Sequence, residues 1–266
     1  MHSFPLTLWL QGGILIAVVI TLLWAVSVRL KDASIIDIFW GPGFLILALF
    51  WYVFADRTYN TSGLPIRSTL VLGMVFLWAT RLAIHIGRRN IGKGEDKRYQ
   101  AWRMNNGPHW WILSYPKVYL LQAVLLWLLS VSICAGITAN DQTFGAISVI
   151  GLIVWLIGFL FEAIADWQLK QFKADSQHRG KLLTSGLWRY SRHPNYFGEA
   201  VLWFGLWLVV LPVGPWWLVG SPLLMLFLLL KVSGVTLLEE SMKQAKPDYA
   251  DYMKRTNAFL PWFPKS

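Results

Sequence analysis

The chain has little charge, a single cysteine and no polar stretch of domain length. Of its 266 residues 14% are charged, whereas 56% are hydrophobic, and soluble domains usually carry about 25% charged residues. Because Cys134 is the chain's one cysteine, an intramolecular disulfide is excluded. Its place in an apolar run favours a packing role. No polar stretch is long enough to bury its own core, which argues against a second soluble domain. Composition therefore predicts an all-α, polytopic membrane protein with a single integral-membrane domain, residues 1–266.

Several motifs of soluble enzymes are also missing. The sequence has no GxGxxG after a strand and no GxxxxGK[ST], so any nucleotide would be held by side chains and not by a glycine-rich loop. HExxH and CxxC are absent, and the five histidines show no metal-ligand spacing, so we predict no metal site. No Ser or Cys nucleophile with a paired base is visible.

Long apolar runs recur along the chain. A helix that crosses the hydrocarbon core needs about 20 apolar residues. We predict seven transmembrane helices, at about 8–28, 35–54, 68–87, 114–135, 146–165, 198–212 and 217–238. The last two are separated at LPVGP, residues 211–215, because proline removes a helix donor; one bent helix plus a re-entrant segment is the alternative. The first run lacks a basic flank and is expected to be a retained helix and not a cleaved signal.

Basic residues give the predicted orientation. The net charge is +10, and the basic residues cluster in alternate connections between the spans and in the C-terminal tail. Of the other connections, residues 55–67 have two basic residues, Arg57 and Arg67, and residues 136–145 have none. By the positive-inside rule the N-terminus lies outside and the C-terminus in the cytoplasm, in a bacterial inner membrane. The cytoplasmic loops are then about 88–113, 166–197 and 239–266. Short basic loops at a membrane do not predict nucleic-acid binding.

An acid lies near the start of the second predicted span. Asp37, in IIDIFWGPGF, is either a helix N-terminal acid that faces interfacial water or an anchor for a polar group of a substrate. Gly41 and Gly43 allow close approach of a backbone or a ligand. Pro42 is expected to break the helix, so that some carbonyls need new partners.

Two further spans end in charged faces. Arg81, His85 and Arg88 share one helix face, which is either a snorkelling interface or the wall of a polar cavity. Residues 88–103 would lie flat on an anionic leaflet or fold over a ligand. In the fifth span Glu162, Asp166, Lys170 and Lys173 follow one face. They form either an ion network or a site in which acids accept from ribose hydroxyls and lysines pair with phosphates.

Five segments of the chain resemble known membrane enzymes. GKLLTSGLWRYSRHPNYFGEAVLWFG (180–205), with the tail EES…DYADYMKRT…FLPWF, resembles both the steroid 5-alpha-reductase family, which uses NADPH, and the isoprenylcysteine carboxyl methyltransferase family, which uses S-adenosylmethionine. DIFWGPGF (37–44), WATRLAIHIGRRNIGKGEDKRYQAWR (78–103) and EAIADWQLKQFK (162–173) look like the bacterial branch of the reductase family. The resemblance implies seven helices, a cofactor cavity open to the cytoplasm, and NADPH-dependent reduction of a C=C bond in a lipophilic, steroid-like conjugated ketone by a monomer.

The resemblance also implies site residues. By position, Asp166, Lys170 and Lys173 hold the nucleotide, Asn195 and Glu199 belong to the shared motif, and Asp37 lies where the family holds a steroid ketone. With their neighbours, the predicted catalytic residues are Asp37, Trp40, Trp78 and His85. The predicted cofactor-binding residues are Arg88, Arg89, Asn90, Lys93, Asp96, Arg98, Tyr99, Glu162, Asp166, Lys170, Lys173, Trp188, Tyr190, Arg192, His193, Asn195, Tyr196, Glu199, Glu239, Glu240 and Tyr252.

The chain departs from the family at several of these places. Lysines stand at 170 and 173 where arginine is common, Ile36 precedes Asp37 where the eukaryotic enzymes have glutamine, and Trp78 stands where they have a proton-donating tyrosine. The alternatives are an S-adenosylmethionine-dependent membrane methyltransferase and a lipid-binding structural protein. S-adenosylmethionine has no phosphate and gives less reason for a basic face. A purely structural role does not explain why three acids, Glu162, Asp166 and Glu199, are predicted at the same cytoplasmic end of the helices.

Within RYSRHPNYFGE, residues 189–199, we expect Pro194 to occupy the first turn of the sixth helix, where its missing N–H is no loss. Asn195 and Glu199 then lie four residues apart on one helix face. A capped helix start with interfacial anchors explains the proline, but it does not explain an acid one turn inside an apolar helix. We therefore interpret the stretch as one wall of a cofactor cavity.

Overall fold

The computed structural model describes residues 4–55, 65–139, 144–232 and 234–265, and these residues form helices and turns with no strand among them. The chain divides into two compact units, Met1–Gly145 with Val210–Leu218, and Ala146–Val209 with Val219–Ser266. Each unit is described by itself. An all-helical fold agrees with the expectation from composition.

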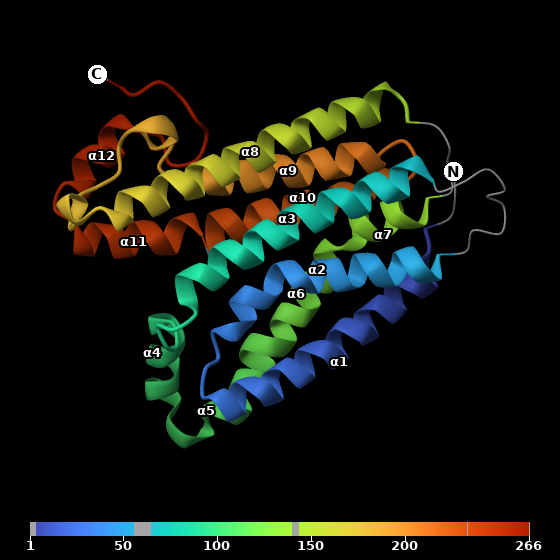
Figure 1. The fold of residues 1–266 in the computed structure, drawn as a ribbon, viewed down its shortest axis with the longest axis horizontal. Helices are drawn as coiled ribbons and strands as arrows, with labels where there is room; N and C mark the ends of the chain where they lie inside the picture. The colour runs from blue at the N-terminus through green and yellow to red at the C-terminus, as the bar shows by residue number, and fades with distance from the viewer. Residues whose placement is uncertain (1–3, 56–64, 140–143, 233, 266) are drawn as a thin grey trace. The chain divides into compact units, whose positions relative to one another are not determined.

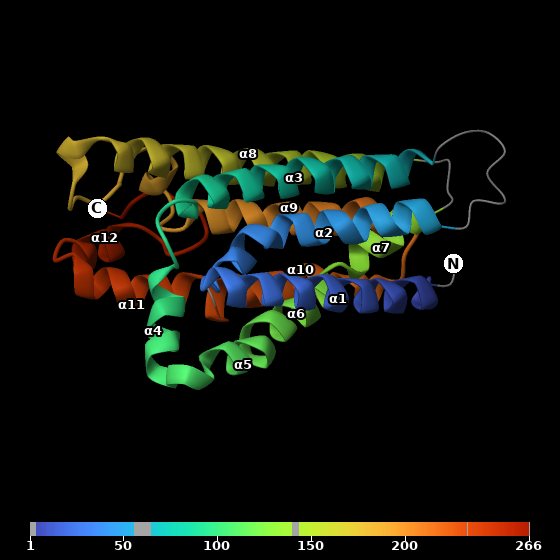
Figure 2. The same cartoon turned by 60° about the horizontal axis from the view of Figure 1, so that its bottom comes forward.

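The first unit is built from three long helices and a fourth, broken one (Figure 1). α1 spans Leu6–Leu30, α2 Ile35–Phe54 and α3 Ile66–Asn90. α2 lies between α1 and α3, as Figures 1 and 2 both show. The chain then forms α4 (Lys97–Asn106), η1 (Gly107–His109), α5 (Trp110–Ser114), the π-helical η2 (Tyr115–Leu120), α6 (Leu121–Leu129) and α7 (Val131–Thr138).

Pro42 does not break its helix. α2 runs without interruption from Ile35 to Phe54 with Pro42 inside it, so the expected break is wrong, although the predicted bounds of this span are correct. The flanking glycines serve helix packing. A Cβ at Gly41 would lie 2.4 Å from the carbonyl oxygen of Ala79 on α3, and one at Gly43 would lie 3.0 Å from Leu126. The close approach at these glycines is therefore to neighbouring helices.

The predicted fourth span, 114–135, is not one helix. It consists of the end of α5, η2, α6 and the first part of α7, with Ser130 between the last two. Ser130 leaves the helical backbone conformation, and its hydroxyl donates to the carbonyl of Trp127 over 2.8 Å. A serine that bonds its own backbone competes with the regular helix pattern.

The second unit is built around α8 (Ala146–Ala174) and α9 (Pro194–Val210), which run side by side (Figure 2). Short 3-10 turns connect them, η3 at Ser176–His178 and η4 at Gly186–Arg189. After α9 the chain contributes a turn at 211–215 and most of η5 (Trp216–Val219) to the first unit. It then returns to the second unit and forms α10 (Gly220–Phe227), the π-helical η6 (Leu228–Val232), α11 (Val235–Ala245) and α12 (Tyr249–Arg255). The predicted turn at LPVGP and the helix start at Pro194 are confirmed.

Glycines bring α8 and α9 into backbone contact. A Cβ at Gly198 of α9 would lie 2.4 Å from the amide nitrogen of Glu162, and one at Gly158 would lie 2.4 Å from the amide nitrogen of Leu202. Two turns further along α9, a Cβ at Gly205 would lie 2.3 Å from the amide nitrogen of Trp155. A Cβ at Gly151 of α8 would lie 2.5 Å from the amide nitrogen of Val209. Small residues at a helix interface let two backbones approach this closely.

Five helical segments in the described part of the chain are long and apolar enough to cross a membrane: Leu6–Leu30, Ile35–Phe54, Ile66–Asn90, Lys97–Leu129 and Ala146–Ala174. α9 has 17 residues, and the predicted seventh span is divided among η5, α10, η6 and α11, so the count of seven stays a prediction. Arg67, one of the two basic residues in the 55–67 connection, is buried in the first turn of α3 and lies over the ring of Phe144. The other, Arg57, lies outside the described residues.

Candidate functional site

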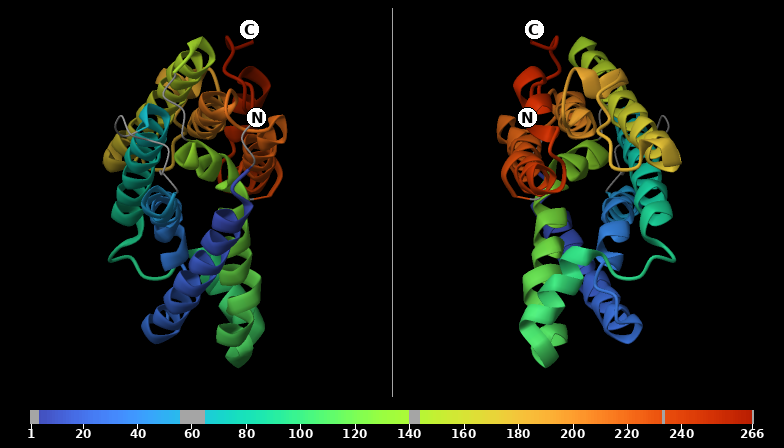
Figure 3. Two further views of the ribbon diagram at one scale, coloured as in Figure 1. Left: turned by 90° about the vertical axis from the view of Figure 1, so that its right-hand side faces the viewer. Right: turned by 90° about the vertical axis from the view of Figure 1, so that its left-hand side faces the viewer.

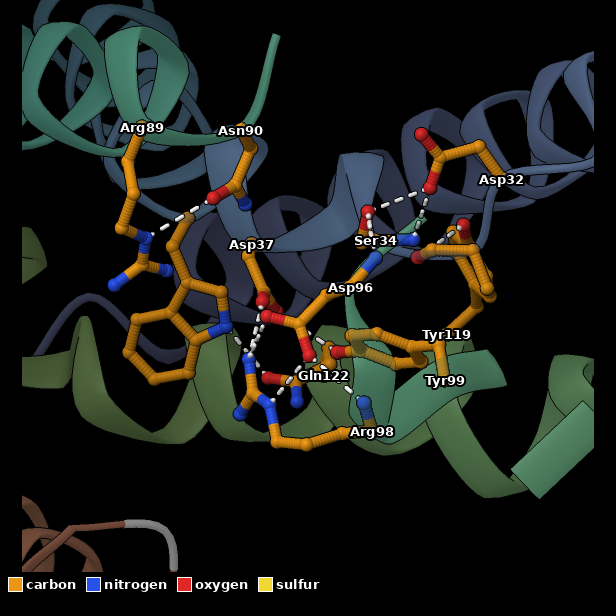
Figure 4. Close-up of polar contacts among 12 residues, drawn as sticks. Asp32, Ser34, Asp37, Arg89, Asn90, Asp96, Arg98, Tyr99, Tyr119 and Gln122 are labelled. Carbon is orange, nitrogen blue, oxygen red and sulfur yellow. Dashed lines mark hydrogen bonds and ion pairs between the residues drawn. The ribbon is translucent and has the colours of Figure 1, made fainter. Parts of the chain in front are cut away.

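Asp37 is the centre of a polar cluster in the first unit (Figure 4). It lies in the first turn of α2, and its two carboxylate oxygens face α4. Oδ1 accepts a hydrogen bond from the Tyr99 hydroxyl over 2.8 Å, and Oδ2 pairs with the Arg98 guanidinium over 2.8 Å. The Asp37 side chain is 17% exposed and that of Arg98 is 53% exposed. Both oxygens thus act as acceptors, and the donors around Asp37 come from α4.

Asp96 caps α4 and binds the same arginine. Its Oδ1 accepts from the backbone N–H of Arg98 over 2.9 Å and from Nε of Arg98 over 3.0 Å. An acid at this position satisfies an unpaired helix N–H and favours the helix start. Burial alone would raise the pKa of Asp96, but the hydrogen bonds and charge of Arg98 outweigh it and hold that pKa below its ordinary value. Asp96 is therefore an ionised partner that fixes where Arg98 points.

A second layer of polar contacts ties the start of α2 to the loop before α4. Asp32 accepts from the backbone N–H of Ser34 over 2.8 Å, and Ser34 Oγ accepts from the Asp96 N–H over 3.3 Å. The buried carboxylate of Glu95 accepts from the Ala33 N–H over 3.0 Å and pairs with Arg103 over 2.9 Å. We did not predict this layer. An Asp-x-Ser pattern ahead of an apolar run is a helix-start signal that would have indicated part of it.

The other predicted catalytic residues lie away from these donors or face other groups. Trp40 Nε1 donates to Gln122 over 2.6 Å, and its ring packs against Phe44 with centroids 5.6 Å apart. Trp78 is buried on α3, and its ring packs against Phe44 with centroids 5.4 Å apart. His85 is partly exposed on α3. The two tryptophans thus belong to an aromatic core around Phe44, and their catalytic roles stay predictions.

Four of the predicted cofactor-binding residues lie where α3 ends. Arg88, Arg89 and Asn90 form the last turn of α3, so they are helical and not part of a loop, whereas Lys93 follows in the turn. Arg88, Arg89 and Lys93 are exposed. Arg89 Nε donates to Asn90 over 3.0 Å. Positive φ angles of 81° at Gly92 and 75° at Gly94 let the chain turn back into α4.

In the second unit the backbone contact of α8 with α9 brings an acid and an amide together. Asn195 Nδ2 donates to Asp166 Oδ1 over 3.1 Å. Asp166 and Glu162 are buried on α8, at 6% and 3% exposure, and Glu199 lies half-buried one turn after Asn195. Lys170 and Lys173 are exposed on the following turns of α8. Two of the predicted cofactor-binding residues, Asp166 and Asn195, thus meet, and exposed cations follow Asp166 on α8.

Arg192 joins the motif to the C-terminal part of the unit. Its Nε and NH2 both bind Glu239 Oε1, over 2.8 Å and 2.5 Å, and its NH1 binds the carbonyl oxygens of Met253 and Thr256. His193 Nε2 lies 3.4 Å from the same Glu239 oxygen. Burial lowers the pKa of His193, and the nearby Glu239 carboxylate opposes that only in part. The contacts of Arg192 are therefore those of a residue that organises the fold, and its predicted contact with a cofactor stays a prediction.

Most of the remaining predicted residues of this unit lie near Arg192 and its partners. Trp188 Nε1 donates to the Ala165 carbonyl over 3.1 Å, and the Tyr252 hydroxyl donates to the Trp188 carbonyl. Tyr196 stacks on His193, with centroids 5.7 Å apart and planes 4° from parallel. Tyr190 packs edge-on against Phe263. Glu240, next to Glu239, is exposed and lies outside this group of contacts.

The fold and its polar clusters define an all-helical protein with apolar helices of membrane-spanning length. Residues 23–256 match the model of a family described as "Protein of unknown function (DUF1295)", and the chain belongs to this family. It is also similar to an uncharacterized protein of Schizosaccharomyces pombe. The two are 27% identical over 274 residues, which cover 94% of this chain and 78% of the yeast protein. No solved structure matches the chain.

Proposed function

We propose that the protein is a membrane-embedded reductase that uses NADPH to saturate the C=C bond of a lipophilic conjugated ketone, such as a 3-oxo-Δ4 steroid. The observation that carries the proposal is the hydrogen bond between Asp166 and Asn195, with Lys170 and Lys173 exposed on the next turns of α8. The resemblance to steroid 5-alpha-reductases assigns Asp166, Lys170 and Lys173 to the nucleotide and places Asn195 in the shared motif.

The chemistry of these side chains fits a phosphorylated dinucleotide. Exposed lysines would pair with the phosphate oxygens, because cations at the edge of a low-dielectric protein bind phosphate more strongly than in water. The half-buried Glu199 carboxylate would accept from ribose hydroxyls, and the Asn195 amide, which holds the buried Asp166, can both donate and accept. When bound, NADPH would supply a hydride to the β-carbon of the ketone, and a proton would complete the reduction at the α-carbon.

The Asp37 cluster would recognise the ketone oxygen. A developing oxyanion needs a preorganised donor, and both oxygens of Asp37 already accept from Tyr99 and Arg98. A protonated Asp37 is therefore not the donor that this arrangement favours. Arg98 is the accessible donor, since its side chain is 53% exposed, and Tyr99 is only 4% exposed. Asp37 would hold these two donors in position.

Ligand-induced stabilisation tests the cofactor. A ligand that binds only the folded protein raises its stability by about 2.7 kcal/mol at 100 times its Kd. We expect NADPH to raise the Tm of the purified protein in detergent and S-adenosylmethionine to leave it unchanged. Asn195→Ala should weaken the affinity for NADPH about tenfold or more, which corresponds to about 1.4 kcal/mol, and should therefore reduce the rise in Tm at a fixed NADPH concentration. Gln244→Ala, at an exposed amide on α11, is the matched control.

The opposite pattern would point to the other cofactor. Stabilisation by S-adenosylmethionine with none by NADPH would exclude the reductase and support a membrane methyltransferase. Undiminished NADPH affinity in the Asn195→Ala variant would remove Asn195 from the cofactor site and leave Asp166–Asn195 as a structural hydrogen bond.

A further inference from the structure

The last residues of the chain form an extended tail after α12 (Figure 3). This tail, residues 257–265, has no regular secondary structure, but its main chain is held firmly. Three backbone hydrogen bonds attach it to the unit: Arg192 N to Asn257 O over 2.9 Å, Trp262 N to Tyr190 O over 2.9 Å, and Lys265 N to Arg255 O over 2.8 Å. The Ser191 hydroxyl also donates to the Phe259 carbonyl over 2.8 Å. The backbone therefore fixes which way the tail's side chains point.

Large apolar side chains of this tail are exposed. Leu260, Trp262 and Phe263 are 66%, 69% and 74% exposed. Phe263 contacts the Tyr190 ring edge-on at 5.9 Å between centroids, which leaves most of its surface uncovered. The held backbone presents three such side chains within four residues, and exposed apolar surface of this kind marks contact with a partner or a membrane.

Basic side chains flank the apolar ones. Arg255 and Lys265 are exposed and are joined through their main chains, and Arg189 is exposed with its guanidinium 6.0 Å from the centre of the Tyr190 ring. Tryptophan, phenylalanine and leucine bordered by lysine and arginine are typical of segments that lie in the interface of an anionic membrane.

We infer that the tail docks on the anionic surface of the bilayer, with Leu260, Trp262 and Phe263 inserted at the level of the headgroups. A stable protein interface usually takes about 20–30 residues from each partner, whereas the tail presents three exposed apolar side chains. A bilayer asks for no complementary shape, and the same chain has helices long and apolar enough to cross one. The docked tail would in turn hold the backbone of residues 190–192, which precede Asn195.

A fluorescent probe on the tail tests this inference. Cys134 is buried, so a Cys134→Ala background allows one new cysteine to be labelled. Trp262→Cys and Leu260→Cys would each carry an environment-sensitive dye, and Gln244→Cys, at an exposed polar position on α11, would be the matched control. The proteins would be placed in nanodiscs of phosphatidylcholine alone or with phosphatidylglycerol, with spin-labelled lipids as depth markers.

We expect both tail probes to shift to shorter wavelength and to lie about 5–10 Å into the headgroup and acyl boundary, more completely with phosphatidylglycerol. Arg255→Gln with Lys265→Gln should remove the preference for the anionic lipid. Tail probes as water-exposed as the Gln244→Cys control in both lipids would overturn the inference. A blue shift without quenching by spin-labelled lipid would also overturn it, because it would mean that protein covers the tail. Neither result depends on the proposed reductase activity.

Discussion

Arg192 and Glu239 form a buried ion pair that joins the start of α9 to α11, with 2.5 Å between NH2 and Oε1 and side chains only 7% and 13% exposed. Removal of one partner would leave a buried charge without its counterion. We expect Glu239→Gln to lower the free energy of unfolding by about 3–5 kcal/mol. Denaturation of the purified protein would measure it.

The same unit supplies the control. Lys254 and Asp251 pair over 2.8 Å at 77% and 69% exposure, and ion pairs this exposed contribute little to stability because water and salt screen them. Asp251→Asn should therefore change stability little. Equal effects of the two variants would mean that Arg192 and Glu239 are as solvated as a surface pair.

Replacement of Gly198 should separate α8 from α9. An added Cβ would lie 2.4 Å from the Glu162 amide nitrogen and 2.7 Å from the Gly158 carbonyl oxygen, and backbone atoms cannot move aside cheaply. We expect Gly198→Ala to destabilise the protein by about 1–3 kcal/mol. Gly73→Ala, on α3 with nothing within 4 Å of its added Cβ, should instead stabilise by about 0.5–1 kcal/mol. Thermal unfolding compares the two, and a neutral Gly198→Ala would contradict the close packing.

His193 should make the protein sensitive to mild acid. Burial lowers its pKa in the folded protein, whereas the unfolded chain takes up a proton near the ordinary value of about 6.5. The unfolded state then binds more protons between the lowered pKa and about pH 6.5, so stability is full above that pH and falls as the pH drops through this window. For one proton the slope reaches at most about 1.4 kcal/mol per pH unit.

His193→Gln should remove that slope, and His109→Gln, at an exposed histidine on η1, should leave it. The measurement is the Tm of each protein from pH 7.5 down to pH 5. A slope that survives in His193→Gln would assign the acid sensitivity to other groups.

Asp37→Asn tests the substrate end of the proposed reductase. The amide keeps the shape but weakens the pair with Arg98, which now lies 2.8 Å from Asp37. We expect kcat/KM for a conjugated ketone to fall about tenfold or more, with the affinity for NADPH unchanged. Asp248→Asn, at an exposed acid, is the control. Unchanged turnover of every ketone tried would rule out this role for Asp37 and leave the cofactor proposal standing.

Lys170 and Lys173 should act on the cofactor through charge. Lys170→Gln with Lys173→Gln is expected to weaken NADPH binding about tenfold or more and to reduce its dependence on salt. The exposed lysines Lys243 and Lys254 provide a matched double variant. Titration at two salt concentrations distinguishes the pairs, and the proposal predicts that only the first pair responds.

The apolar pattern predicted the helices better than their interruptions. The bounds of α2 follow from hydropathy alone, and Pro194 marks the start of α9 because proline is tolerated in a first turn. Pro42 misled the prediction, since a proline inside a membrane helix is accommodated when neighbours satisfy the freed carbonyl. The breaks at Ser130 and in the π-helical segments depend on tertiary packing, which no local pattern records.

The sequence predicted which residues belong to the candidate site, but it did not predict which of them contact one another. The i, i+4 spacing placed Glu162, Asp166 and Lys170 on one face of α8, as the helix confirms. The approach of Asp37 to Arg98 and Tyr99 joins residues about 60 positions apart, and only the fold brings them together. Arg192 illustrates the opposite case, because its side chain is committed to Glu239 and to carbonyls of the C-terminal segment.

The four glycines at the contact between α8 and α9 fix how the two helices are aligned, and with it the spacing of Asp166 and Asn195 at the end of that contact. Because main chain meets main chain at Gly151, Gly158, Gly198 and Gly205, a slide of either helix by one residue would drive a side chain into a backbone. The positions of these glycines thus set the distance between Asp166 and Asn195. Lipid-facing residues of these helices are free to vary without disturbing that distance, whereas one added methyl group in the seam would displace it.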